Sequence, residues 1–280
     1  MMVQSAPADQ PRFICSMAEH NELCGQFARG FGNDRFEKLD PLDEMIYVVG
    51  HHDRGWDDLD AAPVLDSDSG MPHGLGTAPV AGSTQTARFS PDFNEKRHAF
   101  CGLLSSMHSW GLYKARYGYS NFSIRPGGST SIPVPPHLED EANTMLAGEI
   151  ARQERLKATL AADPETARWI EDAHLVKCYK QLQFFDTLAL YFNLRHPDER
   201  GEELYVHVPM TVDDDATVKL DRVSGERYSL DPFPFAGEAL EVTCRGRYFA
   251  PVADGGAPDD LAAMLWDAPR DGQTFVLTPA

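Results

Sequence analysis

Hydrophobic residues recur at helical spacing through most of the first two thirds of the chain. In residues 16–30, Met17, Leu23 and Phe27 follow this spacing, and Ser16 is a candidate N-cap residue. The pattern predicts a helix in this segment. Comparable patterns predict further helices over residues 41–52, 95–117, 138–162 and 165–195.

Residues 60–94 interrupt the helical pattern because they are rich in Gly, Pro, Ser and Asp. Such a composition predicts irregular structure. A loop of this length in a compact domain is often a lid or a binding loop. We therefore expect a long functional loop between the second and third predicted helices.

The pattern changes after Pro197. Short runs such as "ELYVHVPM" and "ALEVTCRGRYFAPV" contain the β-branched and aromatic residues typical of strands, and Gly, Asp and Pro separate them. We place a boundary near residue 198. The expected fold is mainly α, with a helical domain over residues 1–198 and a small β-rich subdomain over residues 199–280.

The composition is that of a globular chain. Hydrophobic residues make up 42% and charged residues 24%, and no stretch approaches the roughly 20 continuous apolar residues of a membrane span. The five cysteines form no CxxC pair, and the first residues lack the basic and apolar regions of an export signal. We expect reduced thiols in a cytoplasmic protein with no membrane partner.

The net charge narrows the range of partners. The chain has 25 Lys and Arg against 43 Asp and Glu, which gives a formal charge of −18. This field repels nucleic acid and anionic lipid surfaces, because both bind to cationic surfaces. A small-molecule substrate is the expected partner, and the sequence leaves open whether the chain forms a homo-oligomer.

Imidazole and carboxylate groups in otherwise apolar helices need an explanation, because burying a polar group without a partner costs roughly 2–7 kcal/mol. Asp186 is the clearest case, since it is the single carboxylate in "QLQFFDTLALYF". These donor types suit Fe, Mn, Zn or Ni better than Ca or Mg. The sequence therefore predicts a buried metal centre. Its other candidate ligands are His20, His52, Asp53, His98 and His108.

The order His, His-Asp, His, His, Asp on successive helices resembles the HD-domain superfamily of metal-dependent phosphohydrolases. That superfamily also contains diiron oxygenases of the myo-inositol oxygenase and phosphonate-cleaving type. The resemblance covers residues 16–195 and implies an HD-domain-like helical bundle with one or two divalent transition-metal ions, Fe or Mn first, with Zn or Ni also suited. It implies that one metal is bound by His20, His52, Asp53 and Asp186. It also implies that Asp53 bridges to a second metal held by His98 and His108.

A closer resemblance covers roughly the whole chain. The segments "GHHDRGWDDLDAAPVLDSDSGMPHG", "LLSSMHSWGLY", "LQFFDTLALYF" and "LDPFPF" together resemble an uncharacterised bacterial family with a domain of unknown function. That resemblance implies no activity.

Each candidate ligand also has a purely structural interpretation. His20 suits a solvated helix position, because acidic and amide residues flank it. His52 and Asp53 suit a polar helix end, although a carboxylate is disfavoured at the C-terminal end of the helix dipole. His108 suits a hydrogen-bonded core histidine, and Asp186 suits an ion pair with Arg or Lys.

His98 and His108 are a difficult pair of ligands for one helix. They are 10 residues apart in the sequence, so on an ideal helix they lie roughly 80° apart around the axis and ~15 Å apart along it. Sharing one metal requires a break in the helix, for which Gly102 is the candidate. His73, in the segment "GMPHG", is the alternative ligand.

Further residues are candidates for orienting the ligands or contacting a substrate. Many HD phosphohydrolases have Lys after His-Asp-x-Gly, whereas this chain has Trp56, so the resemblance is broken where phosphate would bind. On a helix, Tyr179 and Gln183 share the face of Asp186. The full set in this class is His51, Arg54, Trp56, Asp57, Tyr179 and Gln183.

These observations favour a metal-dependent hydrolase of a small phosphorylated or ester-like metabolite, with Asp53 and His108 as the candidate catalytic residues. A bound metal lowers the pKa of water toward neutrality, and His108 or His98 is a candidate general base. A diiron oxygenase is the first alternative, and the loss of the Lys favours it over phosphate hydrolysis. A non-catalytic binding protein that retains an HD-like core is the second.

Overall fold

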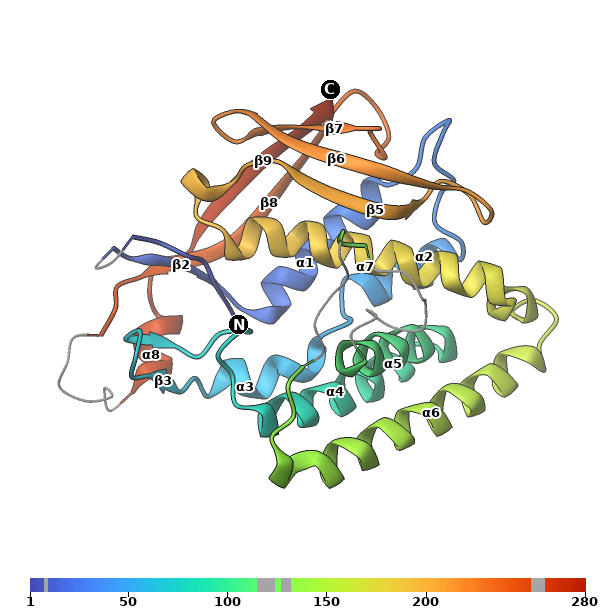
Figure 1. Ribbon diagram of the computed structural model, residues 1–280, viewed down its shortest axis with the longest axis horizontal. Helices are drawn as coiled ribbons and strands as arrows, with labels where there is room; N and C mark the ends of the chain where they lie inside the picture. Colours follow the sequence, from blue (N-terminus) through green and yellow to red (C-terminus); the bar gives the residue numbers. More distant parts are fainter. Residues whose placement is uncertain (8–9, 115–123, 127–131, 253–259) are drawn as a thin grey trace.

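The computed structural model describes residues 1–7, 10–114, 124–126, 132–252 and 260–280, and Figure 1 gives the arrangement of its elements. Its α-helices are α1 (Met17–Gly30), α2 (Leu42–Val49), α3 (Asp57–Ala61), α4 (Val80–Glu95), α5 (Ala99–Tyr113), α6 (Glu139–Ala161), α7 (Asp172–Leu194) and α8 (Leu261–Trp266). Short 3-10 helices are η1 (Arg54–Trp56), η2 (Pro136–Leu138), η3 (Ala167–Ile170) and η4 (Pro197–Glu199).

Seven strands form one mixed sheet in the order β1-β2-β8-β9-β7-β6-β5. Neighbouring strands are antiparallel except for β7 and β9, which are parallel. The strands are β1 (Met2–Val3), β2 (Arg12–Cys15), β5 (Glu203–Pro209), β6 (Asp215–Ser224), β7 (Arg227–Asp231), β8 (Leu240–Phe249) and β9 (Asp271–Pro279). A separate two-stranded pair consists of β3 (Leu65–Asp66) and β4 (Met71–Pro72).

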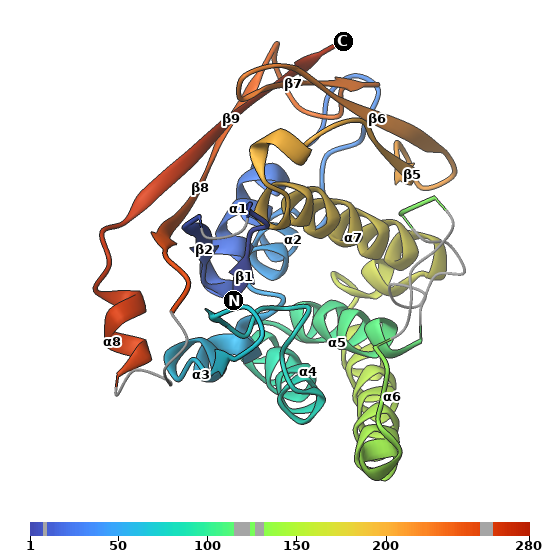
Figure 2. The ribbon, with the colours of Figure 1, turned by 60° about the vertical axis from the view of Figure 1, so that its left-hand side comes forward.

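The sheet contradicts the expected mainly α fold. Helix accounts for 47% of the structure and strand for 21%. Strand β2 pairs with β8, with Phe13 opposite Tyr248, and such pairing between distant short strands leaves little trace in the local sequence pattern. The sheet is therefore more than a small C-terminal extension, and it curves over α1 and α7 (Figure 2). The division into two domains at residue 198 stays a prediction.

The first two helices position three of the candidate residues. The start of α1 is confirmed, because the Ser16 hydroxyl accepts the backbone N–H of Glu19 and the Glu19 carboxylate accepts that of Ser16. Helix α2 is shorter than predicted, since it ends at Val49 with Gly50 as its C-cap. Residues 51–53 consequently lie in a turn and not on the helix.

The expectation of a long loop over residues 60–94 is wrong in its second half. Helix α4 occupies Val80–Glu95, although it contains Pro91. It packs against α5 and η1, and the approach to α5 is close enough that a Cβ on Gly102 would meet Glu95. Tertiary packing thus outweighs an unfavourable local composition.

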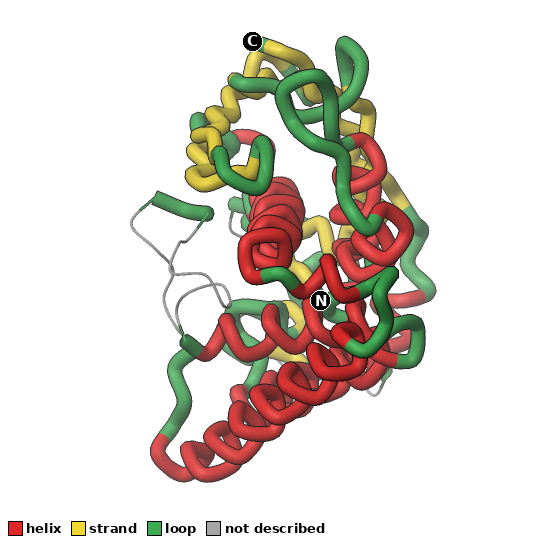
Figure 3. Tube along the Cα trace, turned by 90° about the vertical axis from the view of Figure 1, so that its right-hand side faces the viewer, coloured by secondary structure: helices red, strands yellow, loops and turns green. Residues whose placement is uncertain are grey.

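Helix α7 lies in the core, in contact with α1, α2, α5 and strand β5. Figure 3 shows the strands gathered toward one end of the molecule and most of the helices toward the other. Buried residues occur all round α7 from Leu175 to Asn193, as expected of a core helix. Asp186, in its middle, is 3% exposed. Among the described residues, no helix has the length and apolar character needed to span a membrane.

Candidate metal centre

Helix α1, the turn after α2 and helix α5 meet at the middle of α7. Their ligand atoms form overlapping groups of three within 4.8 Å of one another, for example His52, His108 and Asp186. The histidines are fully buried. The structure brings together five of the six residues that the HD resemblance implied: His20 of α1, His52 and Asp53 of the turn after α2, His108 of α5 and Asp186 of α7.

Most contacts in this centre are longer than hydrogen bonds. His20 Nε2 and His52 Nε2 lie 3.2 Å and 3.7 Å from the same oxygen, Oδ1 of Asp186. The carboxylate of Asp53 lies 3.6 Å from His52 Nε2 and 3.6 Å from His108 Nε2. Two donor atoms bound tetrahedrally to one ion at about 2.2 Å are about 3.6 Å apart. The spacing matches that of donors arranged around a shared ion.

Neighbouring groups determine which imidazole nitrogen faces the centre. His52 Nδ1 donates to the backbone oxygen of Val49 at 2.9 Å. His20 Nδ1 donates to Oδ1 of Asn193 at 2.7 Å, and Asn193 Nδ2 donates to Cys244 Sγ at 3.0 Å. Because a carbonyl oxygen only accepts, each Nδ1 carries a proton and each Nε2 points at carboxylates. Histidines that bind metals are oriented in this way.

The charges in the centre shift its pKa values. Burial alone would lower the pKa of His52, but the carboxylates of Asp53 and Asp186 raise it to about 9. Burial alone would raise the pKa of Asp186, but His20 and His52 hold it well below its usual value. Burial lowers the pKa of the His108 imidazole. The carboxylates therefore require a positive charge between them, which a proton or a metal ion supplies.

One residue of the centre is absent from the sequence candidates. Cys24 lies one helical turn after His20, and its Sγ is 3.6 Å from His20 Nε2. With Asp186, these two residues form another group of three ligand atoms within 4.8 Å. From the sequence, the cysteines are expected to pack as small apolar residues. The i, i+4 spacing from His20 is the signal that points to Cys24.

A family model matches most of the chain. It describes a protein of unknown function, DUF3891, and the match covers residues 1–250. The chain belongs to the DUF3891 family. No curated protein and no solved structure matches the chain. The closer of the two sequence resemblances is thereby confirmed at the level of an uncharacterised family, and the HD resemblance stays a prediction.

In this DUF3891 chain, His98 lies away from the centre. It is the N-cap of α5, where its Nδ1 accepts the backbone N–H of Phe100, and its ring contacts Trp169. Helix α5 runs without a break from Ala99 past His108, so the two histidines remain about 15 Å apart along the axis. His98 is therefore not positioned to share an ion with the other candidates.

His73 and His51 also face other parts of the molecule. His73 Nδ1 lies 3.2 Å from Thr77 Oγ1. His51 Nδ1 donates to the backbone oxygen of Tyr47 at 2.7 Å, and its ring stacks on Tyr47 and Phe93. His51 thus supports the turn after α2 from outside the centre.

The three candidates that follow Asp53 contact one another or the core. Arg54 Nη2 pairs with Asp57 Oδ2 at 2.7 Å, and its guanidinium lies over the ring of Phe93. Trp56 is 7% exposed and packs in the core. The charge of Arg54 is therefore balanced locally, and a substrate contact by these residues stays a prediction.

Tyr179 and Gln183 precede Asp186 on α7 and are fully buried. Neither the Tyr179 hydroxyl nor the Gln183 amide has a hydrogen-bond partner among the described residues. Burial raises the pKa of Tyr179 well above its usual value, and the charges of Asp186 and Asp53 raise it further. Buried polar groups without partners are rare in proteins, so these two are candidates for contact with a ligand.

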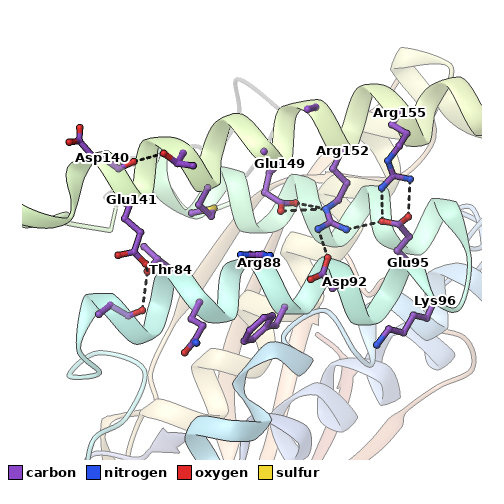
Figure 4. Close-up of a pocket in the computed structure, with 17 residues that line it drawn as sticks. Thr84, Arg88, Asp92, Glu95, Lys96, Asp140, Glu141, Glu149, Arg152 and Arg155 are labelled. Atoms are coloured by element: carbon purple, nitrogen blue, oxygen red, sulfur yellow. Dashed lines mark hydrogen bonds and ion pairs between the residues drawn. The ribbon is translucent and has the colours of Figure 1, made fainter.

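A second charged cluster lies at the surface, in a groove between α4 and α6 (Figure 4). Arg152 pairs through Nη1 with Glu95 at 2.7 Å, through Nε with Glu149 at 3.1 Å, and through Nη2 with Asp92. Arg155 also pairs with Glu95. Each carboxylate of this cluster is paired with a guanidinium group, and the pairs tie α4 to α6.

Proposed function

We propose that the buried centre binds a divalent transition metal and that the protein is a metal-dependent hydrolase of a small phosphorylated or ester-like metabolite. The observation that carries the proposal is the environment of His52 Nε2. Its Nε2 is buried, has no hydrogen-bond partner among the described residues, and faces the carboxylates of Asp53 and Asp186 at 3.6 and 3.7 Å. A metal ion is the partner that satisfies both the nitrogen and the carboxylates.

The donor set supports a transition metal. Three imidazoles and two carboxylates suit Fe or Mn first, with Zn or Ni also suited, and are a poor set for Ca or Mg alone. His20, His52 and Asp186 would hold the ion, with Asp53 beside them. A bound metal of this type supplies a Lewis acid and lowers the pKa of water toward neutrality.

His108 has the properties of a general base. Burial lowers its pKa, so the imidazole is neutral near pH 7 and its nitrogen accepts a proton. Its Nε2 lies 3.6 Å from Asp53, and that carboxylate stabilises the imidazolium formed when the proton arrives. Buried surroundings exclude bulk water from this transfer. Asp53 and His108 are thus the proposed catalytic residues.

The position of His98 favours hydrolysis over the diiron alternative. The oxygenase chemistry implied by the HD resemblance uses four histidines and two aspartates, and His98 caps the far end of α5. The remaining five residues suit one ion better than two. The net charge of −18 supports a small-molecule substrate over nucleic acid, and we retain a cytoplasmic location as part of the proposal.

Metal analysis tests the proposal. Protein purified without oxygen is compared with a His52→Gln/Asp53→Asn double variant and with His73→Ala, which removes an imidazole outside the centre. We expect close to one metal per chain in the wild type and in His73→Ala, and a background amount in the double variant. Equal metal content in all three would refute the centre.

An activity screen separates the two chemistries. The metal-loaded protein is assayed on generic phosphate and carboxylate esters, and dioxygen uptake is recorded in parallel. We expect ester hydrolysis that His108→Gln lowers about a hundredfold or more, the contribution typical of a general base. Dioxygen uptake without hydrolysis would replace the proposal with the oxygenase.

A further inference from the structure

The five cysteines have different surroundings, although all are buried. Cys101 Sγ contacts the backbone oxygen of Glu44 at 3.5 Å, and Cys178 Sγ that of Asp40 at 3.2 Å. The Cys15 and Cys244 thiols interact with each other. Cys24 differs from these four, because its Sγ contacts the imidazole of a candidate metal ligand.

Helix geometry aims the Cys24 thiol at the centre. Cys24 and His20 are four residues apart on α1, so their side chains lie on one face of the helix. Sγ is 3.6 Å from His20 Nε2, and that nitrogen is 3.2 Å from Asp186 Oδ1. Ligands at about 2.0–2.3 Å in a tetrahedral site are roughly 3.3–3.8 Å apart; the separation of Sγ from Nε2 falls in this range, and that of Nε2 from Oδ1 is slightly shorter.

A second observation points to a ligand at the same place. The His52 side chain is fully buried, and its Nε2 has no hydrogen-bond partner among the described residues. This nitrogen lies 3.7 Å from the Asp186 oxygen that also faces His20. The thiol and this nitrogen thus approach the same carboxylate. A cation bound there would satisfy both.

We propose that Cys24 is a metal ligand, which binds as a thiolate together with His20 and Asp186. The inference deepens the proposed function and rests on it. On binding, the Sγ–H bond breaks, an Sγ–metal bond forms and the proton leaves to solvent, so no oxidant or reductant takes part. A thiolate shifts the preference of the site toward Zn, Fe or Co and away from Mn or Mg. The metal choice is therefore narrower than the imidazoles and carboxylates alone indicate.

Cobalt spectroscopy tests the ligand directly. Protein loaded with Co²⁺ is compared with Cys24→Ser and with the control Cys101→Ser, whose thiol contacts a backbone oxygen away from the centre. We expect thiolate-to-cobalt charge-transfer absorption in the near ultraviolet for the wild type and Cys101→Ser. In Cys24→Ser this absorption is lost while the weaker visible bands of Co²⁺ remain. Dialysis with Co²⁺ measures how much metal each protein binds.

The outcomes distinguish the two proposals. Cobalt bound by the wild type without the thiolate absorption, or with equal absorption in Cys24→Ser, would overturn the role of Cys24 and leave the metal centre standing. A wild type that binds no cobalt would overturn both. X-ray absorption of the Zn-loaded wild type needs no variant and therefore covers the case in which Cys24→Ser fails to fold. We expect one sulfur at about 2.3 Å from zinc, and a shell of only nitrogen and oxygen would reject the thiolate.

Discussion

The buried centre and the Arg152 cluster both bring acidic and basic groups together, but they differ in how the charges are paired. In the groove between α4 and α6, Arg152 contacts Glu95 at 2.7 Å and Glu149 at 3.1 Å. In the centre, His52 Nε2 stays 3.6 and 3.7 Å from two carboxylates. The contacts of the surface cluster are short ion pairs, whereas His52 Nε2 lies farther from both carboxylates than a hydrogen bond allows.

The pKa shifts express the same difference. Hydrogen bonds from Arg155 and Arg152 hold the pKa of Glu95 below its usual value, so this carboxylate keeps its charge through cations that the protein itself supplies. In the centre, carboxylates raise the pKa of His52 to about 9. Without a metal ion, a proton on this imidazole therefore supplies the positive charge that the proposal assigns to the metal. A buried cluster whose contacts are longer than hydrogen bonds is thus better evidence for a metal site than a surface cluster of short ion pairs.

The largest expected effect comes from Asp186→Asn. The variant removes the carboxylate that faces both His20 and His52, so metal no longer stabilises the fold. In the wild type, metal at a thousand times its Kd stabilises by about 4 kcal/mol, which raises Tm by roughly 8 °C for a chain of this size. Scanning fluorimetry with and without metal measures the shift. If metal raises the Tm of Asp186→Asn as much as that of the wild type, the ion binds elsewhere.

A smaller effect, confined to stability, is expected for Arg152→Met. Glu149, which is 2% exposed, would lose its counter-charge, at a cost of about 3 kcal/mol. Metal content should stay at the wild-type level. Arg155→Met is the matched control, because its exposed ion pair contributes less than about 1 kcal/mol. Urea denaturation measures both, and equal losses in the two variants would contradict the assignment of Arg152 as the centre of the network.

His98→Ala tests whether that histidine belongs to either cluster. Its Nδ1 accepts the backbone N–H of Phe100 at the start of α5, so we expect a loss of about 1 kcal/mol, the usual effect of removing an N-cap. Metal content and cobalt absorption should not change. A marked fall in metal content would return His98 to the set of ligands.

The smallest expected effect is the pH dependence of the stability that Glu95 contributes through its surface ion pairs. The pKa of Glu95 is lower in the folded protein than in the unfolded chain, so its contribution to stability is present above the unfolded pKa and is lost as pH falls through the folded one. Unfolding free energies of metal-free wild type and Glu95→Gln are compared at pH 7 and pH 3. The two proteins should differ at pH 7, and the difference should be smaller at pH 3. A constant difference would mean that the ion pairs contribute nothing.

Much of the candidate centre is foreseeable from the sequence because its signals are local. Asp186 stands alone in an apolar helix, and His52 and Asp53 follow the apolar run of α2. Cys24 is not among the sequence candidates because most buried cysteines pack as small apolar residues. Only the structure shows its contact with His20. For His98 the helix geometry already argues against sharing an ion with His108, and the unbroken α5 agrees with that argument.

The sheet and α4 are less accessible to sequence reasoning. Strands β1 and β2 are short, and β2 pairs with a strand more than 200 residues away, as in the pair Phe13 and Tyr248. No local periodicity records such a contact. Helix α4 carries residues that disfavour helices in isolation, including Pro91, and its contacts with α5 decide its conformation. Both errors come from long-range packing.

The side-chain amide of Asn193 has a consequence for the whole arrangement. Its oxygen accepts from His20 and its nitrogen donates to Cys244 on β8, so a half-turn of the amide would set its N–H group against the N–H of His20 Nδ1 and break that contact. Strand β8, an inner strand of the sheet, thereby favours one tautomer of an imidazole on α1 through the amide of Asn193. Replacing Cys244 with a side chain that cannot accept would free the amide to invert, and the proton on His20 would then move to the nitrogen that now faces inward.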